Sequence, residues 1–136
     1  SDSNNPKVFR FAGAILCLAE AHLRMGNKAK ACEYLNAIKE RAGIPLVSVA
    51  QFANPDELLK EIQDEAGKEL FGEFNRRYDL IRWGIWYDRI QAHSQSTYLK
   101  DYTLNKPCRE YYPIPNKQVI LSGGALDNKE YAKYGL

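Results

Sequence analysis

Two amphipathic stretches separated by one Gly-Asn pair constrain the fold of this chain more than any other feature. Over residues 7–25, apolar side chains recur at intervals of three and four, and others fill the gaps between them. This pattern predicts a mostly buried helix. A second helix is expected over residues 28–41, with Ala31, Leu35 and Ile38 on one face. Because Gly26-Asn27 leaves so short a turn, we expect an antiparallel hairpin over residues 7–43.

More helices are predicted after Asn54-Pro55, a pair typical of a helix start. The third should run from residue 56 towards Phe71 or Phe74, with a bend or break near Gly72 and a further weak point at Gly67. A short helix should then end at residue 84, and another should cover residues 85–93. Residues 55–93 are therefore expected to be helical with interruptions.

The remaining residues, 94–136, predict an irregular segment rich in tyrosine and proline. Tyr112-Pro113-Ile114-Pro115 fits neither a helix nor a central strand, because two positions lack a backbone donor. We expect this strap to lie over the helical core with Tyr111 or Tyr112 and Ile114 pointing inward. A chain of 136 residues is typical of one domain. The sequence thus predicts a single, mainly α domain.

Charge and residue content exclude several functions. Nineteen basic and seventeen acidic residues leave a net charge of +2, which does not favour a nucleic-acid partner. His22 and His93 lie far apart and the three cysteines lack CxxC spacing, so no metal site is indicated. No nucleophile motif or phosphate loop is present either. We expect a protein that is not an enzyme and needs no cofactor.

The cysteines leave one alternative open. Cys17 and Cys32 lie on the two arms of the hairpin, roughly out of register. They are expected to be two buried thiols, with a disulfide between them as the less favoured alternative. The pairing state of Cys108 is not fixed by the pattern.

A row of glutamates repeats every four residues in the third helix: Glu57, Glu61, Glu65, Glu69 and Glu73. Such a row can hold a hard cation or serve acid–base chemistry. Basic residues lie three or four positions away along the same helix, however. We therefore favour a solvated or ion-paired face.

The densest aromatic patch combines Trp83, Trp86 and Tyr87. Trp83 is expected to be mostly buried near Leu80 and against the hairpin. Aromatic faces stack on sugar rings and other planar ligands. Trp86 and Tyr87 follow the stop at Gly84, so they are the best candidates for carbohydrate binding, although core positions remain the alternative. Six later tyrosines, expected mostly to anchor the strap, offer a second platform: Tyr98, Tyr102, Tyr111, Tyr112, Tyr131 and Tyr134.

The hairpin also resembles a tetratricopeptide unit, in which small residues let two helices approach closely. The resemblance rests on Leu18-Ala19-Glu20-Ala21, Gly26-Asn27 and the apolar face of the second helix. Only one such unit is present, whereas a stable stack needs about three. An adaptor whose hairpin groove receives a protein partner is therefore the alternative function.

A longer motif between residues 73 and 84 contains Glu73, Arg76, Tyr78, Asp79, Leu80, Arg82, Trp83 and Gly84. It resembles the pattern Glu-x-x-Arg-x-aromatic-Asp-Leu-x-Arg-Trp-Gly of the SusD/RagB family of outer-membrane nutrient-binding lipoproteins. Further along, Tyr112-Pro113-Ile114-Pro115 and Asp127-Asn128 with Tyr131 resemble the closing segment of that family. The chain departs at Ala66, where the family usually has arginine, and residues 94–109 match nothing in the family pattern.

The resemblance implies that residues 1–136 form the C-terminal region of a surface protein that binds a glycan and works with a TonB-dependent transporter. It also implies a lipid anchor on a missing N-terminal portion and localisation at the cell outer membrane. No ligand residue of the family falls on a matching position here.

Overall fold

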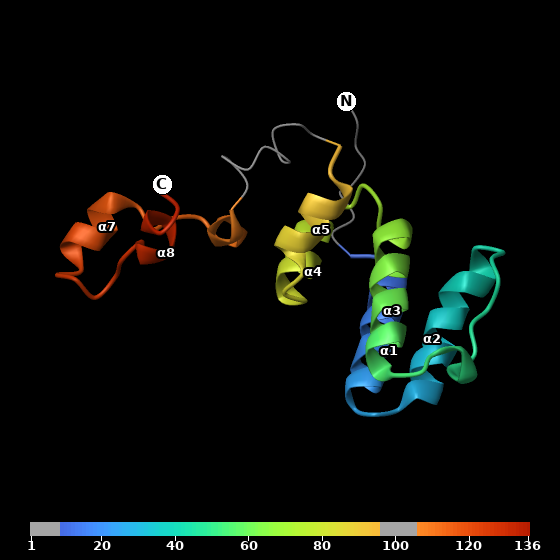
Figure 1. Cartoon of the computed structure of the whole chain (residues 1–136). Helices are drawn as coiled ribbons and strands as arrows, with labels where there is room; N and C mark the ends of the chain where they lie inside the picture. Colours follow the sequence, from blue (N-terminus) through green and yellow to red (C-terminus); the bar gives the residue numbers. More distant parts are fainter. Residues whose placement is uncertain (1–8, 96–105) are drawn as a thin grey trace. The chain divides into compact units, whose positions relative to one another are not determined.

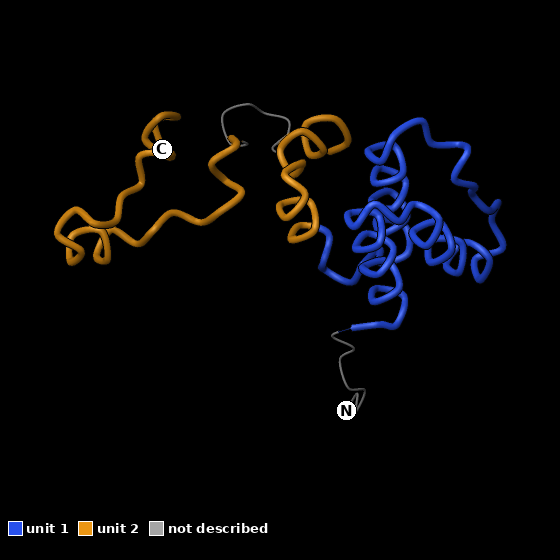
Figure 2. The backbone as a smooth tube through the Cα atoms, turned by 90° about the horizontal axis from the view of Figure 1, so that it is seen from below, with its two compact units in different colours: residues 1–76 blue, residues 77–136 orange. Residues whose placement is uncertain are grey.

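A computed structural model of the chain describes residues 9–95 and 106–136 (Figure 1). Within these residues the protein is helical and has no strand, which confirms the mainly α fold. The chain divides into two compact units, residues 1–76 and residues 77–136 (Figure 2). That these units form the single domain expected from the sequence stays a prediction.

The predicted hairpin is present as α1 (Phe11–Arg24) and α2 (Lys28–Arg41), which pack against each other (Figure 1). Gly26 adopts a left-handed conformation, with φ of +82°, in the turn between them. The Asn27 side chain then accepts a hydrogen bond of 3.1 Å from the backbone N–H of Lys30, which caps α2. The predicted bounds of α2 are confirmed, whereas α1 begins at Phe11 because Arg10 is still extended.

The expectation that α1 is mostly buried is wrong. One stripe of α1 is buried, at Ala12, Leu16, Ala19 and Leu23. The adjoining apolar stripe, which contains Phe11 and Leu18, is exposed. The expectation of two buried thiols is confirmed for Cys32 and is wrong for Cys17, which is exposed; both are free thiols. The alternative, a disulfide between Cys17 and Cys32, is therefore not present.

The loop after α2 is fixed by one side chain. The Asn36 amide donates to the carbonyl oxygen of Val47 and accepts from its N–H, both at 2.8 Å. A short 3-10 helix, η1 (Val49–Gln51), follows. The Asn54 side chain accepts from the N–H of Glu57 at 3.0 Å and caps α3 (Pro55–Glu69), as the Asn-Pro pair predicts. Helix α3 packs on both hairpin helices, and the core comprises Leu35, Ile38, Leu58 and Ile62.

The chain bends after α3 near the predicted position. Gly72 and Phe74 both have positive φ, +79° and +62°, and this conformation prevents a helix from continuing. Gly67 does not interrupt α3, contrary to expectation. A Cβ atom at residue 67 would lie 2.9 Å from the guanidinium carbon of Arg76, so glycine leaves room for that side chain. The Arg76 guanidinium donates to the carbonyl oxygen of Gln63 at 2.9 Å.

The helices described in the second unit are short. Helices α4 (Arg76–Arg82) and α5 (Trp86–His93) are separated by Gly84. The segment expected to be loop-rich contains a 3-10 helix, η2 (Pro107–Glu110), and the helices α7 (Asn116–Leu121) and α8 (Lys129–Ala132). That this strap covers the helical core stays a prediction. Over the described residues, every helix is too short or too polar to cross a membrane.

Candidate functional site

The glutamate row of α3 is largely an ion-paired face rather than a free carboxylate cluster. Lys39 of α2 is buried, and its Nζ lies 2.6 Å from Glu61 and 3.2 Å from Glu65. The Glu65 side chain is only 3% exposed, and exposed Lys68 lies 3.7 Å from it. Burial opposes the charged form of Lys39, but the hydrogen bonds to Glu61 and Glu65 outweigh it and raise the lysine pKa. The ion-paired interpretation is confirmed for these residues.

The next two glutamates are held by arginines from the hairpin. Arg10 donates to the Glu73 carboxylate at 2.6 Å, and its Nη2 lies 3.0 Å from a carboxylate oxygen of Glu69. Arg41 pairs with the other oxygen of Glu69. Burial would raise the Glu69 pKa, but the hydrogen bonds from Arg41 and Arg10 outweigh it and lower that pKa. These pairs tie the end of α3 to the start of α1 and the end of α2.

We expect Glu69 to make this unit sensitive to acid. Its pKa in the folded state lies below the ordinary value of 4.5, so the unfolded chain takes up a proton first as the pH falls. The contribution of Glu69 is therefore complete above about pH 5 and is lost as the pH drops through the folded-state pKa. Urea denaturation from pH 6 to pH 3 measures this loss. A Glu69→Gln variant should show a shallower decline, and an unchanged slope would contradict the prediction.

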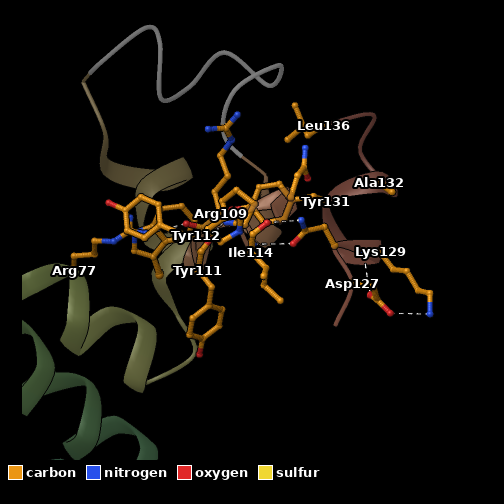
Figure 3. A pocket seen from close by; sticks show the side chains of 15 residues that line it. Arg77, Arg109, Tyr111, Tyr112, Ile114, Asp127, Lys129, Tyr131, Ala132 and Leu136 are labelled. Atoms are coloured by element: carbon orange, nitrogen blue, oxygen red, sulfur yellow. Dashed lines mark hydrogen bonds and ion pairs between the residues drawn. The ribbon is translucent and has the colours of Figure 1, made fainter. Parts of the chain in front are cut away.

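A cavity of about 1130 Å³ opens in the second unit (Figure 3). Its walls come from α4, α5, η2, residues 111–116 and α8. Arg77 of α4 donates from Nη2 to the carbonyl oxygens of Arg109 and Glu110, at 2.9 and 3.0 Å. Its guanidinium carbon lies 5.0 Å from the centre of the Trp86 ring and 5.9 Å from the Tyr112 ring. One arginine thus holds η2 and two aromatic rings together.

The opposite wall is fixed by an asparagine. The Asn128 amide donates to the carbonyl oxygen of Ile114 and accepts from its N–H, both at 2.9 Å. The Tyr131 hydroxyl donates to the carbonyl oxygen of Tyr111. The two prolines that flank Ile114 have no N–H and cannot form a regular ladder of backbone hydrogen bonds. The side chains of Asn128 and Tyr131 bond to the backbone here instead. Residues 112–115 form neither helix nor strand, as predicted, and Asn128 and Tyr131 hold them in place.

Structure and prediction differ for several aromatic residues. Trp86 is 5% exposed, so it does not project into solvent, and Tyr87 is half-buried and does not line the cavity. Trp83 is half-buried rather than mostly buried, and the Arg82 guanidinium lies over its ring. The expectation that Tyr111 or Tyr112 points inward is wrong, since Tyr112 is 87% exposed and Tyr111 is also exposed. Tyr98 and Tyr102 lie outside the described residues.

Arg77 and Arg109 line the cavity, and the sequence did not single them out as candidate site residues. Arg109 contributes a backbone acceptor, and its own Nε is buried without a hydrogen-bond partner among the described residues. The signal available in the sequence was the Arg76-Arg77 pair close to Glu73 in the motif. The cavity also contains Lys129, paired with Asp127 at 2.8 Å. Stacking surfaces, guanidinium groups and amide groups suit reversible binding of a polar ligand.

The described residues bring together no three His, Cys, Asp or Glu side chains that could hold a metal ion. The tetratricopeptide-like hairpin and the cavity lie in different units.

Comparison with known proteins gives one consistent result. The model of the SusD family matches residues 1–131. SusD-like protein P25 of Formosa agariphila is 35% identical over 135 residues, which cover 93% of this chain and 25% of that protein. SusD-like protein P38 of the same organism is 36% identical over 87 residues, 60% of this chain and 17% of that protein. The chain thus spans a quarter or less of these relatives, and no solved structure matches it significantly.

Proposed function

Because this chain belongs to the SusD family, we propose that it is part of a cell-surface protein that binds glycans as nutrients. The family match over residues 1–131 is the observation that carries this proposal. We further propose that the whole protein is lipid-anchored at the outer membrane and delivers oligosaccharide to a TonB-dependent transporter. It binds its ligand and does not transform it.

The cavity of the second unit is the part of this chain best suited to contact a sugar. Tyr112 presents an exposed ring at its edge, and Arg77 holds that ring from one side. Sugar rings stack on such surfaces through their C–H faces, while amide and guanidinium groups donate to hydroxyl oxygens. Trp86 supports Arg77 from beneath, so its carbohydrate role would be to position Arg77 rather than to offer a free face. A direct contact from Tyr87 stays a proposal.

We expect the 136-residue chain alone to show no measurable glycan affinity, with millimolar binding, about −4 kcal/mol, as the outer bound. A few aromatic anchors usually supply most binding energy, and among the described residues the cavity offers two exposed rings, Tyr111 and Tyr112. Titration calorimetry against starch, mannan, host-type and plant glycans measures this directly. The complete gene product should bind at least one of these classes more tightly than the isolated chain.

The variants separate the outcomes. Micromolar binding by the isolated chain would contradict the prediction. If such binding disappeared in Tyr112→Ala but persisted in Tyr134→Ala, an exposed ring that does not line this cavity, the site would be the cavity. Trp86→Phe is preferable to Trp86→Ala in this series, because it retains a buried ring. Failure of the complete protein to bind any glycan, or to co-purify with an outer-membrane transporter, would contradict the proposed function.

A further inference from the structure

The side chains that line the cavity of the second unit carry an excess of positive charge. Three of them are basic and one is acidic: Arg77, Arg109, Lys129 and Asp127. Lys129 and Asp127 lie 2.8 Å apart, so their charges largely cancel. The two arginines pair with no carboxylate among the residues that the structure describes. Because a guanidinium stays protonated, the cavity contains two cations that no acidic side chain compensates.

Arginines of the first unit are compensated. Arg10 and Arg41 both pair with Glu69, and Arg24 pairs with Glu20. The free positive charge at the cavity is therefore a local property of the second unit. Positive charge that the fold does not neutralise attracts anionic ligands.

Both arginines of the cavity also retain hydrogen-bond donors. The hydrogen bonds from Arg77 to the carbonyl oxygens of Arg109 and Glu110 both use Nη2, so they do not engage its Nη1 or Nε. The Nε of Arg109 is buried and has no hydrogen-bond partner in the described part of the chain. A buried charged donor without a partner costs free energy. An anionic oxygen is the partner that satisfies such a donor best.

We propose that this cavity binds an acidic sugar residue, whose carboxylate or sulfate group pairs with Arg109 in the positive field of Arg77. The fork of a guanidinium matches the oxygens of such groups. The exposed rings of Tyr111 and Tyr112 line the same cavity and offer stacking surfaces for the sugar ring. The inference rests on the proposed function, because it specifies which glycans the same site takes.

A smaller cavity of about 440 Å³ adjoins the first and has the opposite charge balance. It shares Tyr111, Tyr112 and Ile114 with the larger cavity. Its described lining includes Asp127 and Glu130 and no basic side chain. The acidic residue of a bound glycan should therefore occupy the larger cavity.

Titration calorimetry of the complete gene product tests the charge of the ligand. The carboxylated probes are polygalacturonate and alginate, the sulfated probes are carrageenan and dextran sulfate, and the neutral controls are methyl-esterified pectin, dextran, starch and mannan. The tightest ligand should be acidic, and removing its charge, as in esterified pectin or plain dextran, should weaken binding at least about tenfold. The set that binds identifies the group as carboxylate or sulfate. A neutral glycan as the tightest ligand would overturn this inference and leave the proposed function intact, whereas binding of no glycan would overturn both.

Matched variants of the complete protein locate the contact. Arg109→Gln removes the cation but keeps the backbone acceptor of Arg77, so it should weaken binding of the acidic probe about tenfold. Lys117→Gln removes a positive charge from an exposed position of α7 that does not line the cavity, and should change the affinity less than about twofold. Arg109→Lys keeps the charge and should retain more affinity than Arg109→Gln. Equal losses in Arg109→Gln and Lys117→Gln would show non-specific attraction and overturn the proposal.

Discussion

We expect the substitution Lys39→Met to lower the free energy of unfolding by about 3–5 kcal/mol. Lys39 is buried, and its ammonium group lies between Glu61 and Glu65. Removal of the ammonium leaves the Glu65 carboxylate in an apolar environment with only the exposed Lys68 at 3.7 Å to compensate. An uncompensated buried charge is far more costly than the loss of an exposed pair. Urea denaturation with linear extrapolation measures the change.

Two further variants isolate the cause. Lys30→Met removes the same ammonium group from an exposed pair with Glu33 on the same helix, so it should leave stability nearly unchanged. Lys39→Met combined with Glu65→Met removes both buried charges and should recover at least half of the loss. If the double variant were less stable than Lys39→Met alone, the cost would not arise from the isolated carboxylate.

The second large effect is expected at Trp86. The substitution Trp86→Ala should cost about 3–5 kcal/mol, because this ring is 5% exposed and supports the Arg77 guanidinium at 5.0 Å. The loss should be confined first to residues 77–136, which form their own compact unit. Amide hydrogen exchange of α4 and α5 measures that local stability. Fluorescence of Trp83, the other tryptophan of the chain, follows the same transition.

Trp83→Ala is the natural comparison for this measurement. Trp83 is only half-buried, so its replacement should cost clearly less than that of Trp86. Equal or reversed losses would show that the indole of Trp86 is not the core residue of this unit. Trp86→Phe retains an apolar ring and should retain most of the stability.

Helices were predicted well where local pattern alone decides them. Helix α2 has a capping asparagine, a regular apolar face and a terminal glycine, and its bounds are those expected. The outer bounds of the signature helices, residues 55–93, also agree with α3 and α5. The start of α1 was placed too early because Arg10 is extended and reaches Glu73, sixty-three positions away. No local pattern contains such a contact.

The cavity could not be predicted for the same reason, because long-range contacts form it. The aromatic residues were identified, but helical spacing does not show which of them are buried. Arg77 determines their arrangement, since it donates to backbone carbonyls of η2 and places its guanidinium over Trp86 and Tyr112. Backbone acceptors carry no sequence signal. Helix α1 shows the opposite error. Its apolar pattern predicted burial, but the stripe that contains Phe11 and Leu18 is exposed.

The Asn128 amide is hydrogen-bonded to both backbone groups of Ile114, and this contact lets the segment between the two residues vary in length. Residues 115–127 form a loop whose two ends are fixed by one side chain, so insertions there need not displace either end. Closing a loop of twice the length costs only about 0.6 kcal/mol more. Helix α7 lies within this loop and its side chains are largely exposed. Residues 117–126 do not line the cavity, so a tag, a fluorophore or an added hairpin can be inserted there with little disturbance of it.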